Sequence, residues 1–277
     1  MPLNLTGVSY TYDRVQPAVA ALSCADVEVG SGELVLVLGT TGSGKSTLLR
    51  VAGGLLSPTA GTVLIDERPL DRTDVGGEVG LVFQDAEAQL FADTILEDVA
   101  FGPSNKGLSK SAAHDRAREA LRSVGLEPDE FGGRSPFSLS GGEARRAAIA
   151  GVIAMRPRYL LADEPTAGLD AGGRSSIRSL LLDSRSRGGV MVVSHSADEF
   201  LADADRVLIL RDGGVEWWGR ATELIDDPTP LTHAGLKPPP ILDIQARMRE
   251  ITGGRDAFTL DPVAAARSLA SGRRRCP

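Results

Sequence analysis

The residues between positions 34 and 49 have the types and the spacing needed to bind the phosphates of a nucleotide. Residues 34–38 form an apolar run of the length of a buried parallel strand. The glycines after it let the backbone approach a ligand closely, and a helix beginning at Lys45 would direct free N–H groups and its positive dipole end at the same point. Lys45 adds a charge for the β- and γ-phosphates, and Ser46 adds a hydroxyl for Mg²⁺. The pattern G-x-x-x-x-G-K-[ST] therefore predicts a nucleoside triphosphate site made by Gly39, Thr40, Thr41, Gly42, Ser43, Gly44, Lys45, Ser46 and Thr47.

Two acidic residues follow a second apolar run and fit the chemistry of phosphate transfer. Asp163 ends the run that begins at Tyr159, which is where a carboxylate completes the ligand shell of Mg²⁺ together with the loop hydroxyl. Glu164 points in a different direction and is placed to polarise an attacking water, an effect of about 10²–10⁴ in rate. A solvated acidic turn is the plainer interpretation, and the phosphate loop upstream argues against it.

Four candidate side chains follow the ends of predicted strands. Gln84 comes after an apolar strand at 79–83, and His195 comes after another at 190–193. Strands that alternate with helices predict a mostly parallel sheet, whose ligands bind beyond the carboxyl ends of the strands. We therefore expect Gly39, Gln84, Asp163 and His195 to converge. His195 alone would more often be structural.

The stretch from about 85 to 156 is predicted to be helical. Thr94 and Glu97 fit a capping box, alanines recur at helical spacing between 113 and 120, and Ser140-Gly141-Gly142-Glu143 again has the form Ser-x-x-Glu. The hydroxyl, backbone N–H groups and dipole of this last helix start suit the outer face of a γ-phosphate. Spacing does not decide whether it reaches the nucleotide of its own chain or of a second one.

The two ends of the chain differ from this middle part. Residues 3–37 are predicted to be β-rich, and Tyr12 lies at the end of the first β segment. Tyr12 is either an ordinary half-exposed strand tyrosine or an aromatic ring that stacks on a nucleotide base. Near the other end, Pro238-Pro239-Pro240 interrupts the chain, and apolar residues then recur at helical spacing. The apolar positions of this helix are Ile241, Ile244, Met248 and Ile251. A second short helix is predicted from Pro262.

Composition excludes several classes of protein. The 277 residues carry a net charge of −7, which argues against a nucleic-acid partner because backbone phosphate requires clustered Lys and Arg. Apolar runs stay far below the roughly 20 residues that cross a bilayer, and the first residues lack the pattern of a secretory signal, so we expect a cytoplasmic location. Cys24 and Cys276 have no metal-ligand spacing. Residues 231–277 hold eight Lys/Arg against four Asp/Glu and form a separate compositional unit.

Taken together and in this order, the motifs resemble those of the ATP-binding cassette (ABC) family over roughly residues 3–225. The resemblance implies a P-loop NTPase of class α/β, with a mostly parallel core sheet, an antiparallel β subdomain and an inserted α-helical subdomain at about 85–156. It implies a domain at 1–230, a C-terminal helical extension at 231–277, and ATP and Mg²⁺ as cofactors. In that family two cassettes meet head to tail, so that each signature segment closes on the phosphate loop of the other.

The resemblance also implies a role for each residue that matches a family motif. Glu164, His195 and Gln84 would be catalytic, and Ser46, Gln84 and Asp163 would hold the metal. Tyr12, residues 39–47 and Ser140, Gly141, Gly142 and Glu143 would bind the nucleotide. Glu143 stands where many cassettes carry Gln, and Ala144-Arg145-Arg146 replaces a commoner Lys-Gln-Arg. Neither departure removes a catalytic group, so we expect a competent site.

Within the family, residues 83–91, Thr94-Ile95 and residues 98–105 resemble the ATPase subunits of energy-coupling factor (ECF) transporters, which import vitamins or cobalt and nickel ions. That branch implies a second ABC ATPase, identical or paralogous, a membrane-embedded T component and a substrate-binding S component. It places the chain peripherally on the cytoplasmic face of the membrane. Asp85 and Glu87 would then receive a basic side chain of the T component, or they are solvated loop acids.

Several alternatives stay open at this point. The chain could be the ATPase of a conventional ABC transporter, or a soluble cassette of DNA repair or translation. The second class usually has two cassettes, zinc-binding cysteines or coiled-coil insertions, none of which this sequence shows. The C-terminal helices either hold two ATPases together or pack on their own domain, and Arg273-Arg274-Arg275 is a solvated tail or a lipid contact. The transported substrate is not encoded in these motifs.

Overall fold

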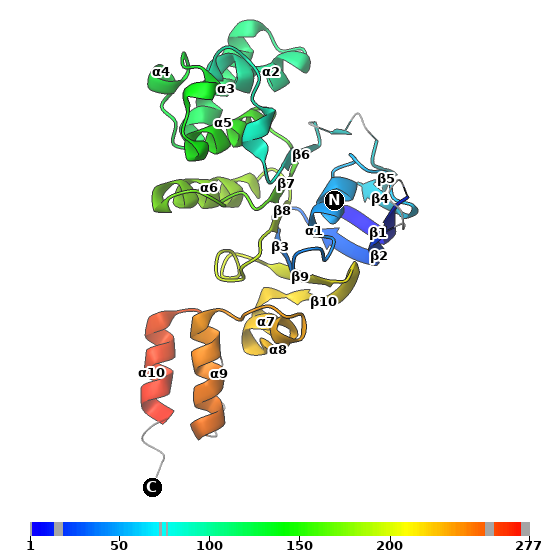
Figure 1. The fold of residues 1–277 in the computed structure, drawn as a ribbon, viewed down its shortest axis with the longest axis vertical. Coiled ribbons are helices and arrows are strands. Elements are labelled where there is room, and N and C mark those ends of the chain that lie inside the picture. Colours follow the sequence, from blue (N-terminus) through cyan, green and yellow to red (C-terminus); the bar gives the residue numbers. More distant parts are fainter. Residues whose placement is uncertain (1, 14–18, 72–73, 76, 253–257, 273–277) are drawn as a thin grey trace.

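A computed structural model describes residues 2–13, 19–71, 74–75, 77–252 and 258–272. It contains a central six-stranded sheet and a separate four-stranded sheet (Figure 1). Neighbouring strands of the central sheet are parallel, except for the antiparallel pair formed by residues 206–211 and 214–220. Neighbouring strands of the smaller sheet are all antiparallel. In spatial order the central sheet is β10 (Gly214–Arg220), β9 (Arg206–Arg211), β3 (Leu34–Gly39), β8 (Val190–Val193), β7 (Tyr159–Asp163) and β6 (Val79–Val82). The smaller sheet is β2 (Val19–Val29), β1 (Leu3–Tyr12), β4 (Ala60–Ile65) and β5 (Arg68–Pro69).

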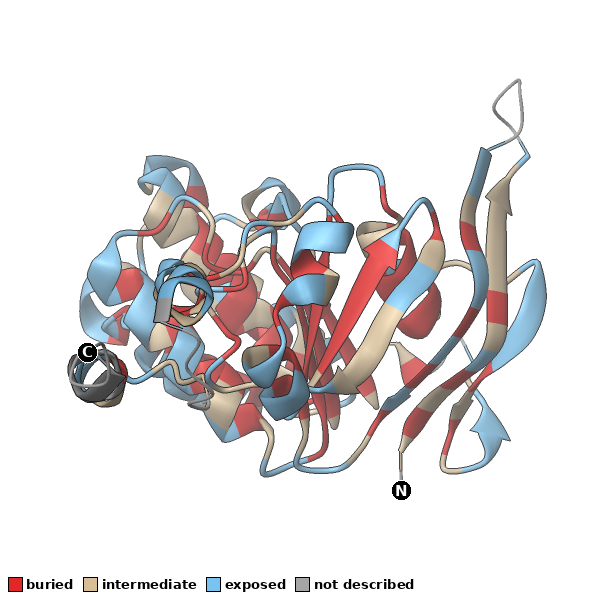
Figure 2. Ribbon diagram, turned by 90° about the horizontal axis from the view of Figure 1, so that it is seen from below, coloured by how far each residue is buried: buried red, intermediate tan, exposed pale blue. Residues whose placement is uncertain are grey.

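The central strands are buried along their whole length, which is why their sequences are continuous apolar runs rather than alternating ones. Figure 2 shows the buried residues concentrated in these strands. Alternate residues of β3 enter two different cores: Val35 and Val37 pack toward the antiparallel sheet, whereas Leu34 and Leu36 pack toward the helices of the other face. The predicted α/β class with a mostly parallel sheet is confirmed.

The remaining elements cover the sheets or extend from them. The α-helices are α1 (Lys45–Ala52), α2 (Ile95–Asn105), α3 (Lys110–Ser123), α4 (Pro128–Phe131), α5 (Gly141–Ala154), α6 (Ala171–Ser184), α7 (Ala221–Asp226), α8 (Thr229–His233), α9 (Pro240–Thr252) and α10 (Pro262–Gly272). Two short 3₁₀ turns, η2 (Ala86–Gln89) and η3 (Pro136–Ser138), lie in the stretch that was predicted to be helical. Helices α2 to α5 form one group at the top of Figure 1.

The two predicted capping boxes have different outcomes. At α5 both hydrogen bonds of the box form between Ser140 and Glu143. At α2 only half of it forms: Thr94 Oγ1 accepts from the Glu97 N–H at 3.3 Å, but the Glu97 carboxylate does not return the bond. That carboxylate lies 3.2 Å from Lys110 Nζ and 3.3 Å from His114 Nε2 instead. The prediction at α2 was wrong in this respect because cations of α3, invisible to a local motif, compete for the same carboxylate.

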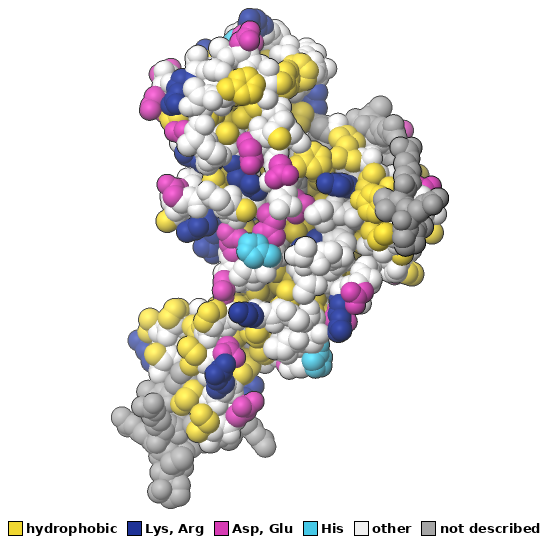
Figure 3. All heavy atoms as spheres, viewed as in Figure 1, with side chains coloured by type: hydrophobic (Ala, Val, Ile, Leu, Met, Phe, Trp, Pro, Cys, Tyr) yellow, Lys and Arg dark blue, Asp and Glu magenta, His cyan; other side chains and the backbone are white. Residues whose placement is uncertain are grey.

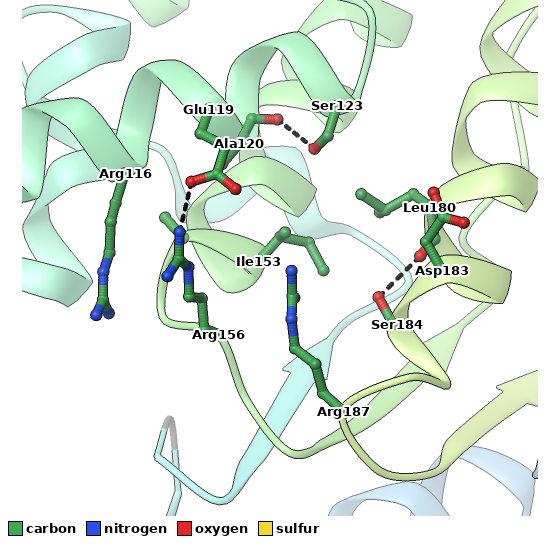
Figure 4. Close-up of a pocket in the computed structure, with 11 residues that line it drawn as sticks. Arg116, Glu119, Ala120, Ser123, Ile153, Arg156, Leu180, Asp183, Ser184 and Arg187 are labelled. Atoms are coloured by element: carbon green, nitrogen blue, oxygen red, sulfur yellow. Dashed lines mark hydrogen bonds and ion pairs between the residues drawn. The ribbon is translucent and has the colours of Figure 1, made fainter. Parts of the chain in front are cut away.

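A polar cleft of about 110 Å³ lies between α3, the C-terminal end of α5 and α6 (Figure 4). Arg156, just past α5, pairs there with Glu119 of α3 at 2.6 Å. Arg116 and Arg187 also line the cleft. The surface between the helical group and α6 therefore carries charged, solvent-exposed side chains at this end of α5.

The C-terminal helices α9 and α10 lie side by side at the lower end of Figure 1. Their existence matches the predicted helical spacing, but the predicted apolar side of α9 is not its buried side. Leu242 and Gln245 are buried, whereas Ile244 and Ile251 are 53% and 78% exposed. Gln245 decides the orientation because its side chain exchanges hydrogen bonds of 2.7 and 3.1 Å with the backbone of Thr259. Residues 273–275 lie outside the described residues.

Candidate active site

The phosphate loop wraps around its own lysine. Lys45 Nζ donates to the carbonyl oxygens of Gly39 at 2.7 Å and Thr40 at 2.9 Å. Burial lowers the pKa of Lys45, and the nearby carboxylates of Glu164 and Asp163 act against that change. The loop backbone thus folds around the Lys45 ammonium group.

Glycine is required at position 44 because the antiparallel sheet packs directly onto this loop. Gly44 has φ +100°, and a Cβ there would lie 2.3 Å from the carbonyl oxygen of Ala21 in β2. Close by, Ser43 Oγ is buried and has no hydrogen-bond partner among the described residues. An unpaired buried hydroxyl in a phosphate loop leaves a donor for a ligand oxygen.

The register of the sheet brings the predicted strand ends together. Gly39, the last residue of β3, pairs with Leu210 of β9, and Asp163, the last residue of β7, lies opposite Val193, the last residue of β8. Val82 at the end of β6 lies opposite Ala162. Gln84 and His195 follow β6 and β8 at this same edge, so the expected convergence beyond the carboxyl ends is observed.

Glu164 and His195 are in direct contact at this edge. His195 Nδ1 and Glu164 Oε2 form a hydrogen bond of 2.8 Å, with the glutamate side chain 12% exposed and the histidine 74% exposed. Burial raises the pKa of the Glu164 carboxyl above its ordinary value, and the bond from His195 opposes that rise. A carboxylate with this shift is better matched to removing a proton from water than a fully solvated one.

The residues around Asp163 fit a magnesium ion that arrives with a nucleotide. Among the described residues there is no group of three His, Cys, Asp or Glu side chains that could hold a metal by itself. The site offers instead one buried carboxylate from Asp163, the hydroxyl of Ser46 and the amide of Gln84. Mg²⁺ typically takes one or two protein oxygens, and phosphate oxygens and waters complete its octahedral shell.

The signature segment, residues 139–143, is ordered by hydrogen bonds between neighbouring residues. Glu143 Oε2 accepts from the backbone N–H and from the hydroxyl of Ser140, both at 2.8 Å, and Ser140 Oγ accepts from the Glu143 N–H at 3.4 Å. These bonds lower the pKa of the Glu143 carboxyl. The segment lies at the start of α5 in the helical group, whereas the phosphate loop lies between β3 and α1 (Figure 1).

Tyr12 lies beside the phosphate-loop helix. Its hydroxyl is 3.3 Å from Thr47 Oγ1, and its ring meets that of Tyr10 edge to face at 4.8 Å between centroids. The base-stacking role predicted for Tyr12 is compatible with this position.

One residue of the site was not singled out by the sequence. Arg145 of α5 is buried, and its guanidinium reaches the backbone carbonyl oxygens of Glu164 and Pro165. It also lies 3.7 Å from the Glu87 carboxylate, so Glu87 has an ionic partner in its own chain, whereas Asp85 is exposed. In the sequence, Arg145 was noted only as part of Ala144-Arg145-Arg146, the segment that departs from the commoner Lys-Gln-Arg.

Comparison with known proteins agrees with this geometry. The family model described as ABC transporter matches residues 22–167, just over half of the chain. The chain belongs to the ABC transporter family. This membership confirms the predicted cassette fold and identifies the chain as an ATPase.

Relatives within the ABC family narrow the branch. The chain is 44% identical to the energy-coupling factor transporter ATP-binding protein EcfA2 of Symbiobacterium thermophilum, over 99% of this chain and 98% of that one. It is 38% identical to the EcfA2 protein of Clostridium acetobutylicum, over 94% of this chain and 95% of the relative. The chain therefore belongs to the ECF branch of ABC proteins.

Two solved structures show the same fold. One is a dimeric ATP-binding cassette in a post-hydrolysis state, bound to ADP and Pi, with a TM-score of 0.72, 33% identity and coverage of 80% of this chain and 99% of that chain. The other is cbiO1 of Clostridium perfringens, part of the ABC transporter complex cbiONQ, with a TM-score of 0.72, 31% identity and coverage of 88% and 98%.

Proposed function

We propose that this chain is the ATP-hydrolysing subunit of an ECF-type ABC transporter, which powers import of a micronutrient, a vitamin or a cobalt or nickel ion. The observation that carries the proposal is similarity over nearly the whole chain, C-terminal extension included, to proteins named energy-coupling factor transporter ATP-binding proteins. We assign residues 1–230 to the ABC domain and residues 231–277 to the extension.

In this proposal the phosphate loop binds the β- and γ-phosphates of ATP. Lys45 exchanges the carbonyl oxygens of Gly39 and Thr40 for phosphate oxygens, and the loop N–H groups at residues 39–47 donate to the same phosphates. Tyr12 stacks on the base. Ser46, Gln84 and Asp163 would hold Mg²⁺, which supplies neutralisation of the phosphate oxygens when it is bound.

Glu164 is the group that we assign to proton transfer. Its carboxylate, held next to His195 at 2.8 Å, accepts the proton of the attacking water, and His195 orients the carboxylate and the γ-phosphate. Gln84 stands on the neighbouring strand end and senses the same phosphate. Glu164 stays largely shielded from solvent, which keeps its pKa raised.

The second half of each site comes from a second ATPase subunit. Ser140, Gly141, Gly142 and Glu143 lie exposed or half-buried at the start of α5, and the side chains of Ser140 and Glu143 form hydrogen bonds with each other's residue. The free N–H groups and dipole of α5 would stabilise charge on a γ-phosphate bound to the partner chain. The partner is a second copy of this chain or a paralogue.

A groove in the helical group suits a helix of the membrane-embedded T component. It has a volume of about 440 Å³ and is lined mainly by apolar side chains of α2, of α5 and of the residues that directly follow η2 and α5, including Leu90, Phe91, Phe101, Val152 and Met155. Phe91 and Phe101 are 58% and 48% exposed, and their rings meet edge to face at 4.9 Å. Figure 3 shows hydrophobic side chains exposed on this helical group. Large exposed aromatic side chains in a groove mark an interaction site.

None of the described helices is long and apolar enough to cross a membrane. In this proposal the T component holds the chain peripherally, on the cytoplasmic face of the membrane. The S component, in turn, would carry the substrate. Nucleic acid is not a partner in this proposal.

The test is purification of the tagged chain from membranes of the cell that makes it, followed by identification of the bound subunits. A second cassette, one T-like membrane subunit and a small S-like subunit are expected. A pair of conventional transmembrane domains, or a DNA-repair or translation complex, would overturn the proposal.

A variant with Phe91→Glu and Phe101→Glu should lose the membrane subunit but keep its own ATP binding. The matched control is Leu55→Glu, which changes an exposed apolar residue outside the groove and should retain the membrane subunit.

A further inference from the structure

Arg145 makes three polar contacts although it lies inside the molecule. Its side chain is only 8% exposed. Nη2 donates to the carbonyl oxygen of Glu164, Nε donates to that of Pro165 at 3.3 Å, and Nη1 lies 3.7 Å from Glu87 Oε2. One planar guanidinium thus joins α5, the loop after β7 and the turn η2. Arginine suits such a position because its donors point in fixed, divergent directions.

The peptide that Arg145 holds is conformationally unusual. Glu164 has φ +49°, in the left-handed region that residues other than glycine rarely adopt and that persists only where surrounding contacts impose it. Its N–H donates to the carbonyl oxygen of Val193 at 3.0 Å. With Arg145 on the carbonyl side, the peptide groups on both sides of Glu164 are fixed, and so is the direction of its side chain toward His195.

Glu87 holds the other side of the guanidinium. Its Oε2 atom is buried and has no hydrogen-bond partner among the described residues, and it faces Arg145 Nη1 at 3.7 Å, although the Glu87 side chain as a whole is 39% exposed. Glu87 belongs to η2, which lies directly before Leu90 and Phe91 of the proposed docking groove. A displacement of η2 would therefore move a carboxylate that faces this guanidinium.

We propose that Arg145 is a positioning residue for hydrolysis: anchored by Glu87, it holds the backbone of Glu164 in the left-handed conformation that aims its carboxylate at the attacking water. The inference rests on the proposed role of Glu164 as the proton acceptor.

The opposite end of α5 supplies a matched control. Arg156, just after α5, forms an ion pair of 2.6 Å with Glu119 of α3. The two side chains are 45% and 61% exposed and line the cleft of Figure 4. Among the described residues, neither side chain forms a hydrogen bond with the loop after β7. Changing this pair perturbs the same helix without touching Glu164.

The experiment compares Arg145→Lys and Glu87→Gln with Arg156→Lys and Glu119→Gln in the ATPase complex that copurifies with the tagged chain from membranes. Lysine keeps the charge but presents one compact ammonium, which cannot serve two carbonyls and a carboxylate together. We expect Arg145→Lys to lower kcat about tenfold and Glu87→Gln about threefold, with the KM for ATP changed less than about twofold. Both control variants should keep kcat within about twofold.

A second readout separates positioning from simple support of the fold. A positioning role lowers kcat while the KM for ATP and the melting temperature of the complex stay close to their wild-type values, whereas a general loss of packing lowers the melting temperature and raises KM as kcat falls. If Arg145→Lys does not fold, Glu87→Gln, which leaves the arginine in place, carries the test.

The proposal is overturned if kcat is unchanged in the variants that fold, if their KM for ATP rises as much as kcat falls, or if the control pair lowers kcat equally. Failure of the proposed function has a different result: Glu164→Gln in the wild-type background would then retain hydrolysis. Loss of activity in Glu164→Gln with full activity in Arg145→Lys would refute the positioning role alone.

Discussion

The phosphate loop at 39–45 and the signature turn at 140–143 bind the same kind of group in the proposed site but are held in opposite ways. The loop lies between two sheets, and tertiary contacts fold it around Lys45. The turn is shaped by a capping box within four residues and faces outward. The loop is a complete cradle in one chain, whereas the turn is a prepared surface whose ligand must come from elsewhere.

The comparison explains why such a cassette works as a pair. A single chain can bind ATP through its loop, but it leaves the outer face of the γ-phosphate open. The similar cassette that was solved after hydrolysis, with ADP and Pi, is dimeric. Variants of the loop should therefore change binding, and variants of the turn should change only turnover.

The largest effect should come from the residue between these two surfaces. Glu164→Gln removes the proton acceptor and leaves both surfaces intact, so hydrolysis should fall about 10²–10⁴-fold while ATP binding is kept. Steady-state phosphate release and equilibrium nucleotide binding measure the two quantities. The acid limb of the pH profile, where activity is lost as pH falls through the raised pKa of Glu164, should also disappear. Undiminished hydrolysis would refute the role of Glu164.

The next effect tests the loop. Lys45→Ala removes an ammonium that sits inside the folded loop, and charge-assisted hydrogen bonds of this kind contribute about 1.5–3 kcal/mol, so ATP affinity should fall about 10–100-fold. Titration calorimetry on the purified chain measures it. Lys237→Ala, an exposed lysine, is the control. Wild-type affinity in Lys45→Ala would count against the loop assignment.

The smallest effect tests the turn. Ser140→Ala removes one N-cap, which costs about 1 kcal/mol of helix stability, together with a hydroxyl offered to the partner's nucleotide. We expect kcat to fall about tenfold with single-chain ATP affinity unchanged. Ser109→Ala is the matched control because Ser109 caps α3 in the same manner, with its Oγ accepting from Ala112 N–H at 3.3 Å. Equal losses of kcat in both variants would make the turn a purely structural cap.

Much of the site could be predicted because its signals are local or follow from the sheet. The loop motif is contiguous, and Asp163 and His195 follow apolar runs whose length marks buried parallel strands. Once the strands are parallel, their carboxyl ends must share an edge. The same reasoning located the helical insertion but missed β10, whose residues 214–220 are mostly half-exposed and lack an apolar run.

The remainder depended on contacts between distant parts of the chain. The sequence by itself determined the cassette class, the phosphate loop and the strand ends that carry Gln84, Asp163 and His195, because short-range spacing and the period of buried strands specify them. Only the tertiary structure decided that the Glu97 carboxylate pairs with Lys110 instead of closing the capping box of α2. It also decided which face of α9 is buried, and that Arg145 binds the carbonyl group of Glu164, whose backbone is left-handed. The physical reason is that a buried polar group takes its partner from whichever element packs against it, and that neighbour lies far away in sequence.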